Sequence, residues 1–128
     1  MSYGFSKEVD LSYEKALEKV TGELKKEGFG VLTEIDVKET LKKKLNVDFK
    51  KYKILGACNP PFAYQALQTE EQIGLMLPCN VIIYVTDNGR TVVAAIDPVA
   101  SMRAVQNSEL LKISAEVQSK LKNVIDRI

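Results

Sequence analysis

Cysteine is the residue type in this sequence best suited to chemistry, and it occurs twice, at Cys58 and Cys79. Each cysteine is followed directly by asparagine and has proline close by, in the blocks ILGACNPPFAYQAL (54–67) and MLPCNVIIYV (76–85). A thiolate can serve as a nucleophile, as one half of a redox pair or as a ligand for a soft metal ion such as Cu(I). Free cysteine also packs as a small buried hydrophobe. The two Cys-Asn blocks therefore fit either a reactive site or a part of the core.

The sequence contains no histidine, and this removes several classes of mechanism. Ser-His-Asp and Cys-His nucleophile systems, histidine metal ligands and the HExxH helix are all excluded. The sequence also has no GxGxxG or Walker phosphate loop. Two thiols and one carboxylate are fewer than the four ligands of a structural zinc site, so no metal site is predicted.

Length and composition indicate a single domain that spans residues 1–128. The 18 Lys and Arg are balanced by 17 Asp and Glu, so the charge gives no footprint for nucleic acid or for an anionic membrane. The N-terminal stretch MSYGFSKEVD is not a signal peptide, and no segment approaches the roughly 20 apolar residues of a membrane span. We therefore expect a cytoplasmic protein in which Cys58 and Cys79 stay reduced.

Hydrophobic periodicity outlines the elements that must position the two thiols. Alternation of apolar and polar residues predicts five strands, over residues 3–9, 29–35, 52–58, 79–86 and 91–97. Helical spacing and capping residues predict a helix after each of the first three strands, a helical turn at Asp97-Pro98 and a long helix over 108–127. Gly56, inside the third strand, indicates a bulge or the close approach of another group. The order βαβαβαββα predicts an α+β fold: a curved, mainly antiparallel sheet of about five strands with helices packed on one face.

The dipeptide Asn88-Gly89 lies between two β-branched runs and predicts a two-residue type I′ hairpin. Counting back from that turn along the two strands places Asn80 opposite Asp97. The hairpin would then gather Cys79, Asn80 and Asp97 at one end of the sheet.

Cys58 ends the third strand, just ahead of a helix whose N-cap is predicted to be Asn59. The partial positive charge of that helix N-terminus would stabilise a Cys58 thiolate, whereas Cys79 has no such aid. If the third and fourth strands are antiparallel neighbours, both thiols lie at the same edge of the sheet. The candidate ligand-binding site then consists of Cys58, Asn59, Cys79, Asn80 and Asp97. The alternative is two core cysteines, with Asn and Asp side chains that cap helices and strand ends.

Several longer segments carry a resemblance to a known family. GFGVLTEIDVKETLKKKL, KILGACNPPFAYQAL, GLMLPCNVIIYV, the hairpin and AAIDP resemble the bacterial and archaeal family named domain of unknown function 302, and the resemblance covers nearly the whole chain. It implies a fold like that of the TATA-binding protein, with a curved antiparallel sheet and helices across one side. It also implies a small dimer-forming protein, and it implies no established activity.

Three functional classes remain open. The favoured class is a non-enzymatic module, working as a homodimer, that binds a small molecule or a partner. The second is a thiol enzyme or redox protein that uses Cys58 or Cys79, and the third is a thiolate carrier of a soft metal ion. An enzyme is disfavoured because the sequence offers no strong acid–base pair. A homodimer is favoured because the last two strands are apolar on both faces, and the face without helices then needs a cover.

Overall fold

The computed structural model describes residues 2–128 and contains five strands and five α-helices. The strands are β1 (Gly4–Val9), β2 (Gly30–Asp36), β3 (Tyr52–Cys58), β4 (Cys79–Val85) and β5 (Thr91–Ile96). The helices are α1 (Tyr13–Lys26), α2 (Val37–Leu45), α3 (Pro60–Thr69), α4 (Pro98–Met102) and α5 (Ser108–Asp126). Two 3-10 segments complete the secondary structure: η1 (Glu71–Met76) lies between α3 and β4, and η2 (Arg103–Val105) lies between α4 and α5.

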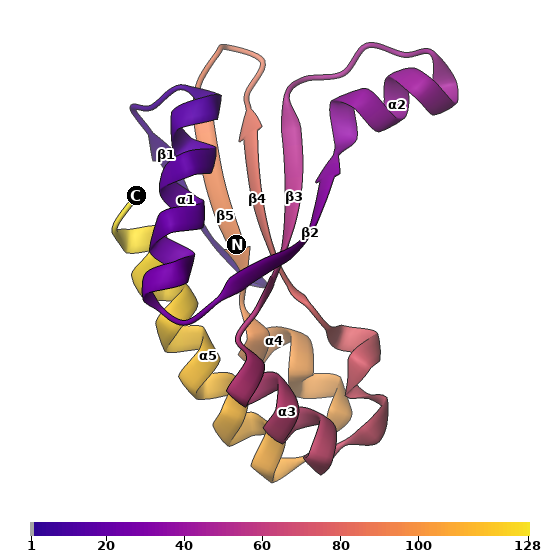
Figure 1. Cartoon of the computed structure of the whole chain (residues 1–128), viewed down its shortest axis with the longest axis vertical. Coiled ribbons are helices and arrows are strands. Elements are labelled where there is room, and N and C mark those ends of the chain that lie inside the picture. Colours follow the sequence, from indigo (N-terminus) through magenta and orange to yellow (C-terminus); the bar gives the residue numbers. More distant parts are fainter. Residues whose placement is uncertain (1) are drawn as a thin grey trace.

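All five strands form one antiparallel sheet in the order β1-β5-β4-β3-β2 (Figure 1). The first strand of the chain therefore pairs with the last, and β3 and β4 are antiparallel neighbours, as the sequence predicts. The predicted α+β fold, with about five antiparallel strands and helices packed on the sheet, is confirmed.

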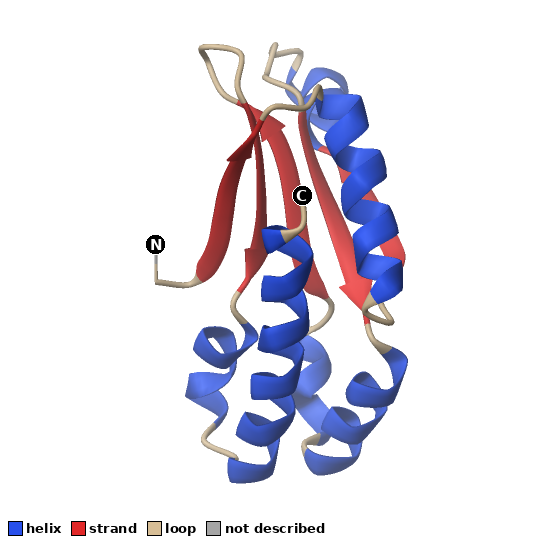
Figure 2. Ribbon diagram, turned by 90° about the vertical axis from the view of Figure 1, so that its left-hand side faces the viewer, coloured by secondary structure: helices blue, strands red, loops and turns tan. Residues whose placement is uncertain are grey.

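The helices α1 and α5 cover one face of the sheet (Figure 2). Side chains alternate along each strand, so every second residue points toward these helices. On β4, for example, Val81 and Ile83 are fully buried, whereas Ile82 and Tyr84 point to the opposite face and are only half-buried. We call the buried group under α1 and α5 the sheet cluster; its largest fully buried members include Leu24, Leu55, Ile83, Leu121 and Val124.

The helices α3, α4 and the first half of α5 lie beyond the end of the sheet rather than over its face (Figure 1). There they build a second, smaller hydrophobic group of Ala66, Ile73, Met102 and Leu110, which we call the helical cluster. No helix within residues 2–128 is long and apolar enough to cross a membrane.

The prediction of a two-residue type I′ turn between β4 and β5 is wrong. Thr86 N donates to Arg90 O over 2.7 Å, and Gly89 N donates to Thr86 O over 3.0 Å. Three residues therefore form the loop, and Gly89 has a φ of 82° whereas Asn88 is not among the described residues with positive φ. This geometry is a type I turn followed by one left-handed glycine. The extra residue shifts the register by one, so that Val81 pairs with Ala95.

We expect Gly89→Val to destabilise the fold by about 1–2 kcal/mol, because a β-branched side chain is strained at positive φ. A Cβ at this position would meet no heavy atom within 4 Å, so the loss comes from backbone strain and not from a clash. Gly89→Asn is the control, since asparagine tolerates the left-handed region, and it should lose much less. Urea unfolding measures both variants, and equal losses for Val and Asn would contradict this explanation.

Candidate functional site

A cavity of about 290 Å³ lies at the end of the sheet where β3 finishes and β4 begins. Its wall includes Ala57 and Val117 from the sheet cluster, and Ala66 and Met102 from the helical cluster. The strands stop at this level while the helices continue beyond them (Figure 1). The cavity is therefore the space between two hydrophobic clusters that no strand fills.

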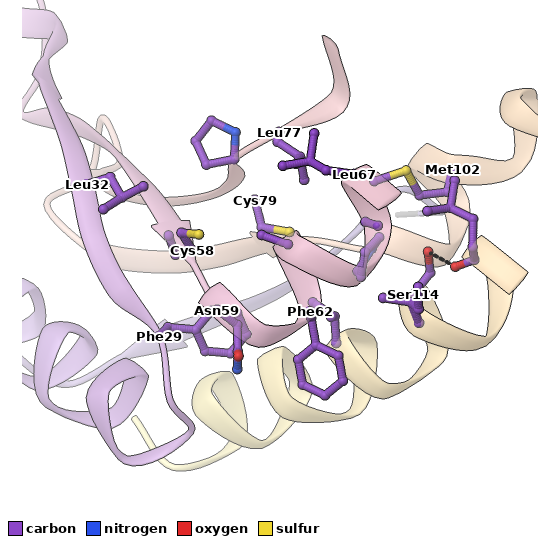
Figure 3. Close-up of a pocket in the computed structure, with 18 residues that line it drawn as sticks. Phe29, Leu32, Cys58, Asn59, Phe62, Leu67, Leu77, Cys79, Met102 and Ser114 are labelled. Atoms are coloured by element: carbon purple, nitrogen blue, oxygen red, sulfur yellow. Dashed lines mark hydrogen bonds between the residues drawn. The ribbon is translucent and has the colours of Figure 1, made fainter. Parts of the chain in front are cut away.

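Two helices supply the far wall through residues at helical spacing. From α3 come Phe62, Ala63, Ala66 and Leu67, and from α5 come Leu110, Ile113, Ser114 and Val117. The near wall consists of strand ends, with Leu77 and Pro78 leading into β4 (Figure 3). Leu32 and Leu67 line the cavity and are 69% and 44% exposed, so they mark the side on which it meets solvent.

Both thiols belong to the near wall. Cys79 pairs with Ala57 across β3 and β4, and Cys58 is the next residue along β3. Cys58 and Cys79 are free thiols, both partly buried, and both line the cavity (Figure 3). Burial raises the pKa of Cys79 to about 11, with a smaller contribution from the neighbouring Cys58 thiol. Cys79 is therefore protonated and uncharged at neutral pH.

Asn59 is buried and lines the cavity, but its side chain does not cap α3 as predicted. Its Nδ2 donates instead to the main-chain oxygen of Glu27, over 3.1 Å. Glu27 is the C-cap residue of α1, where main-chain carbonyls lack helical partners. Asn59 thus ties the C-terminal end of α1 to the start of α3, and that hydrogen bond fixes which end of its amide is the donor.

We expect Asn59→Ala to cost about 1 kcal/mol and Asn59→Asp to cost more, about 2 kcal/mol, because a carboxylate cannot donate to the Glu27 carbonyl. An N-cap would give the opposite order, since aspartate caps a helix as well as asparagine does. Urea unfolding at neutral pH compares the two variants. An Asp variant as stable as the native protein would contradict the role of the Glu27 contact.

The other two candidate residues lie outside the cavity wall. The prediction that Asn80 faces Asp97 is wrong, because the shifted hairpin register ends the β4–β5 pairing at Val81 and Ala95. Asn80 pairs with Gly56 on β3 and is exposed. The Asp97 carboxylate caps α4, as predicted, by accepting from Val99 N and Ala100 N, and it also accepts from Gln118 Nε2 over 2.9 Å. The structure therefore places Cys58, Asn59 and Cys79 in the wall of one cavity and leaves Asn80 and Asp97 outside that wall.

Most of the cavity wall carries no distinguishing pattern in the sequence. Phe62, Ala63 and Leu67 look like the buried stripe of an ordinary amphipathic helix, and so does the α5 series. Within residues 2–128, no group of three or more Cys, Asp, Glu or His side chains is placed to hold a metal ion.

The fold and the cavity define a small α+β protein with an open antiparallel sheet and a mostly apolar cavity at one end of it. The chain belongs to the family described as domain of unknown function DUF302, whose family model matches residues 5–128. It is similar to a solved structure described as an uncharacterized conserved protein DUF302 from Bacillus stearothermophilus, with 29% identity and a TM-score of 0.92. That similarity covers 99% of this chain and 98% of the other. No curated protein matches the chain.

Proposed function

We propose that the chain is a single domain whose function is to bind a small molecule in the cavity at the end of the sheet, without catalysis. The observation that carries the proposal is the cavity itself, about 290 Å³ in volume and lined almost entirely by apolar side chains. Ligand sites in proteins are typically concave and mostly apolar, with a few polar groups that fix orientation. Here Cys58, Cys79 and Asn59 are the polar groups on the sheet side.

Two features favour binding over the thiol alternatives. The Cys79 thiol is protonated at neutral pH because burial raises its pKa, so it is a poor nucleophile and must lose a proton before it can bind a metal ion. Asp97 is the one carboxylate in the candidate set, and its hydrogen bonds engage it in capping α4 and holding Gln118.

The test is native mass spectrometry of the protein taken directly from cells, followed by titration with 2-methylnaphthalene as an uncharged probe. The chain has no tryptophan, so the probe's fluorescence can be followed without indole emission. We expect a bound small molecule in the native protein, or uptake of the probe once the protein has been stripped. A folded protein with neither would overturn the proposal.

A matched pair of variants on α3 locates the binding. Ala63 lines the cavity, whereas Gln65 on the same helix is exposed and is not part of the lining. Ala63→Leu should fill the cavity and abolish uptake of the probe, and Gln65→Leu should leave uptake unchanged. Equal binding by both variants would place the probe elsewhere.

We also propose that two copies of the chain associate through the sheet face that α1 and α5 leave uncovered. Ile54, Ile82 and Ala94 lie across the middle of that face in adjacent strands. The Tyr52 and Tyr84 rings stack beside them with centroids 5.2 Å apart. Removing an apolar sheet face from water is favourable, and a two-fold related copy of the chain offers an identical apolar face to pack against.

Light scattering at micromolar concentration tests the homodimer. We expect the native mass to be twice that of the chain, and Ile82→Lys to reduce it to the monomer, because Ile82 lies at the centre of this face. Leu75→Lys is the control, since Leu75 on η1 is 84% exposed and a charge there should change nothing. A monomeric native protein would remove the homodimer and would leave the cavity proposal untouched.

A further inference from the structure

The cavity wall has few polar side chains, and two of them, Asn59 and Ser114, already donate hydrogen bonds to main-chain oxygens of the protein. Ser114 Oγ donates to Leu110 O over 2.8 Å, inside the helix (Figure 3). Asn59 Nδ2 donates to Glu27 O. What remains for a bound molecule is the second N–H of the Asn59 amide, two thiol groups, which are weak donors, and the acceptor oxygens of Asn59 and Ser114. Among its side chains, the wall therefore offers a ligand one amide N–H, on Asn59, as its single strong hydrogen-bond donor.

The wall also offers no charge. None of the described residues that line the cavity is Lys, Arg, Asp or Glu. Lys120 Nζ lies 6.0 Å from the centroid of the Phe62 ring, and Lys120 is not a lining residue. A carboxylate or ammonium group placed in this cavity would lose its hydration without gaining a partner of opposite charge, which is strongly unfavourable.

We propose that the cavity selects an uncharged, largely hydrocarbon molecule and rejects fatty-acid-like anions and amine cations of the same shape. This inference rests on the proposed function and names the ligand class of the same site. Four observations carry it together: the apolar helical wall, the Ser114 hydroxyl and the one Asn59 N–H that are already hydrogen-bonded within the protein, the protonated thiol of Cys79 and the absence of charged residues from the described lining.

The volume sets the size of the ligand. An apolar cavity of roughly 150 Å³ holds one benzene molecule. At about 290 Å³, this cavity has room for a molecule of about twice that size, such as a bicyclic ring or a chain of roughly ten carbon atoms. A hydroxyl or carbonyl group on it would meet the two thiols and the Asn59 amide of the near wall, which suffice for a neutral group and cannot neutralise a charge.

Three probes of nearly the same shape test the selection: 1-naphthalenemethanol, 1-naphthoate and 1-naphthylmethylammonium. They differ at one substituent, which is neutral, anionic or cationic at pH 7. We expect the alcohol to bind the stripped protein, and both ions to bind at least about 100-fold more weakly, since each must bury an unpaired charge. Ala63→Leu should abolish binding of the alcohol, and Gln65→Leu should retain it.

The outcomes separate this inference from the proposed function. If 2-methylnaphthalene and the alcohol both fail to bind the folded protein, the proposed function falls and the ligand class falls with it. If the neutral probes bind but 1-naphthoate or the ammonium binds within about tenfold of the alcohol, the cavity is a ligand site and the inference is overturned. If an ion binds Ala63→Leu as well as it binds the native protein, it binds outside the cavity. That binding is then subtracted before the ion is compared with the alcohol.

Discussion

Gly56→Ala should destabilise the protein by about 2–3 kcal/mol, although it adds a single methyl group. A Cβ at position 56 would clash with Thr33 Oγ1 and would lie 2.7 Å from Pro78 Cγ. The Thr33 hydroxyl can turn away, but the proline ring cannot, and β3 is held between β2 and β4. Urea unfolding gives the difference. An unchanged midpoint would show that the β2 bulge beside Thr33 and the segment before β4 move apart freely.

Gly22→Ala is the matched control, with the opposite expected sign. Gly22 is exposed inside α1, and a Cβ there would meet nothing within 4 Å. Alanine should stabilise that helix by about 0.5–1 kcal/mol. Combining Gly56→Ala with Thr33→Ala should recover part of the loss, and the double-mutant cycle would report how much of it is the contact with Thr33. Because Pro78 lines the cavity, Gly56→Ala should also weaken uptake of the neutral probe.

The elements of this fold could be predicted because they depend on local patterns. The alternation over residues 52–58 predicts a strand, and β3 occupies that range; the bounds of the other four strands differ from their predicted bounds by at most one residue. Gly56 carried a readable signal as well. Its lack of a side chain indicated a bulge or a close approach, and the structure has both, with the bulge in β2 between Val31 and Thr33.

Errors arose where one local pattern fits two geometries. Asn88-Gly89 suits a two-residue turn and also a three-residue turn that ends in a left-handed glycine, and the difference of one residue separated Asn80 from Asp97. Asn59 precedes two prolines, which is typical of an N-cap. Its actual partner, the Glu27 carbonyl, is 32 positions away in the chain, and no local pattern reports a contact of that kind.

The cavity could not be predicted because it depends on where strands end relative to helices. The residues of its far wall have the same spacing as residues that fill a core, and they become a wall because α3 and α5 continue past the sheet. The two cysteines were the one part of the site with a sequence signal. Their strand-end positions were predictable from the Cys-Asn blocks, and the burial that keeps Cys79 protonated was not.

The stability of the protein should fall between pH 9 and pH 11 by about 2 kcal/mol through Cys79 alone. The unfolded thiol loses its proton near its ordinary pKa of 9.0, whereas burial raises the folded pKa to about 11. Between these values the folded state holds a proton that the unfolded state has released, so raising the pH favours unfolding. The stabilisation is complete below pH 9 and is lost progressively as the pH rises through 11. Urea unfolding at several pH values from 7 to 11 measures the slope.

Lysine and tyrosine residues also titrate in this range, so a variant must isolate the thiol. Cys79→Ala removes the titrating group. The unfolding free energy of this variant should therefore fall less steeply with pH than that of the native protein. Alkylation gives a second readout, because at pH 8 a thiol of pKa about 11 is roughly 0.1% thiolate. Native Cys79 should therefore react with iodoacetamide about 100-fold more slowly than an ordinary exposed cysteine, and bound 2-methylnaphthalene should slow it further. The same pH slope in Cys79→Ala and native protein, together with rapid labelling of Cys79, would show that the thiol is not desolvated and that the near wall of the cavity is open to water.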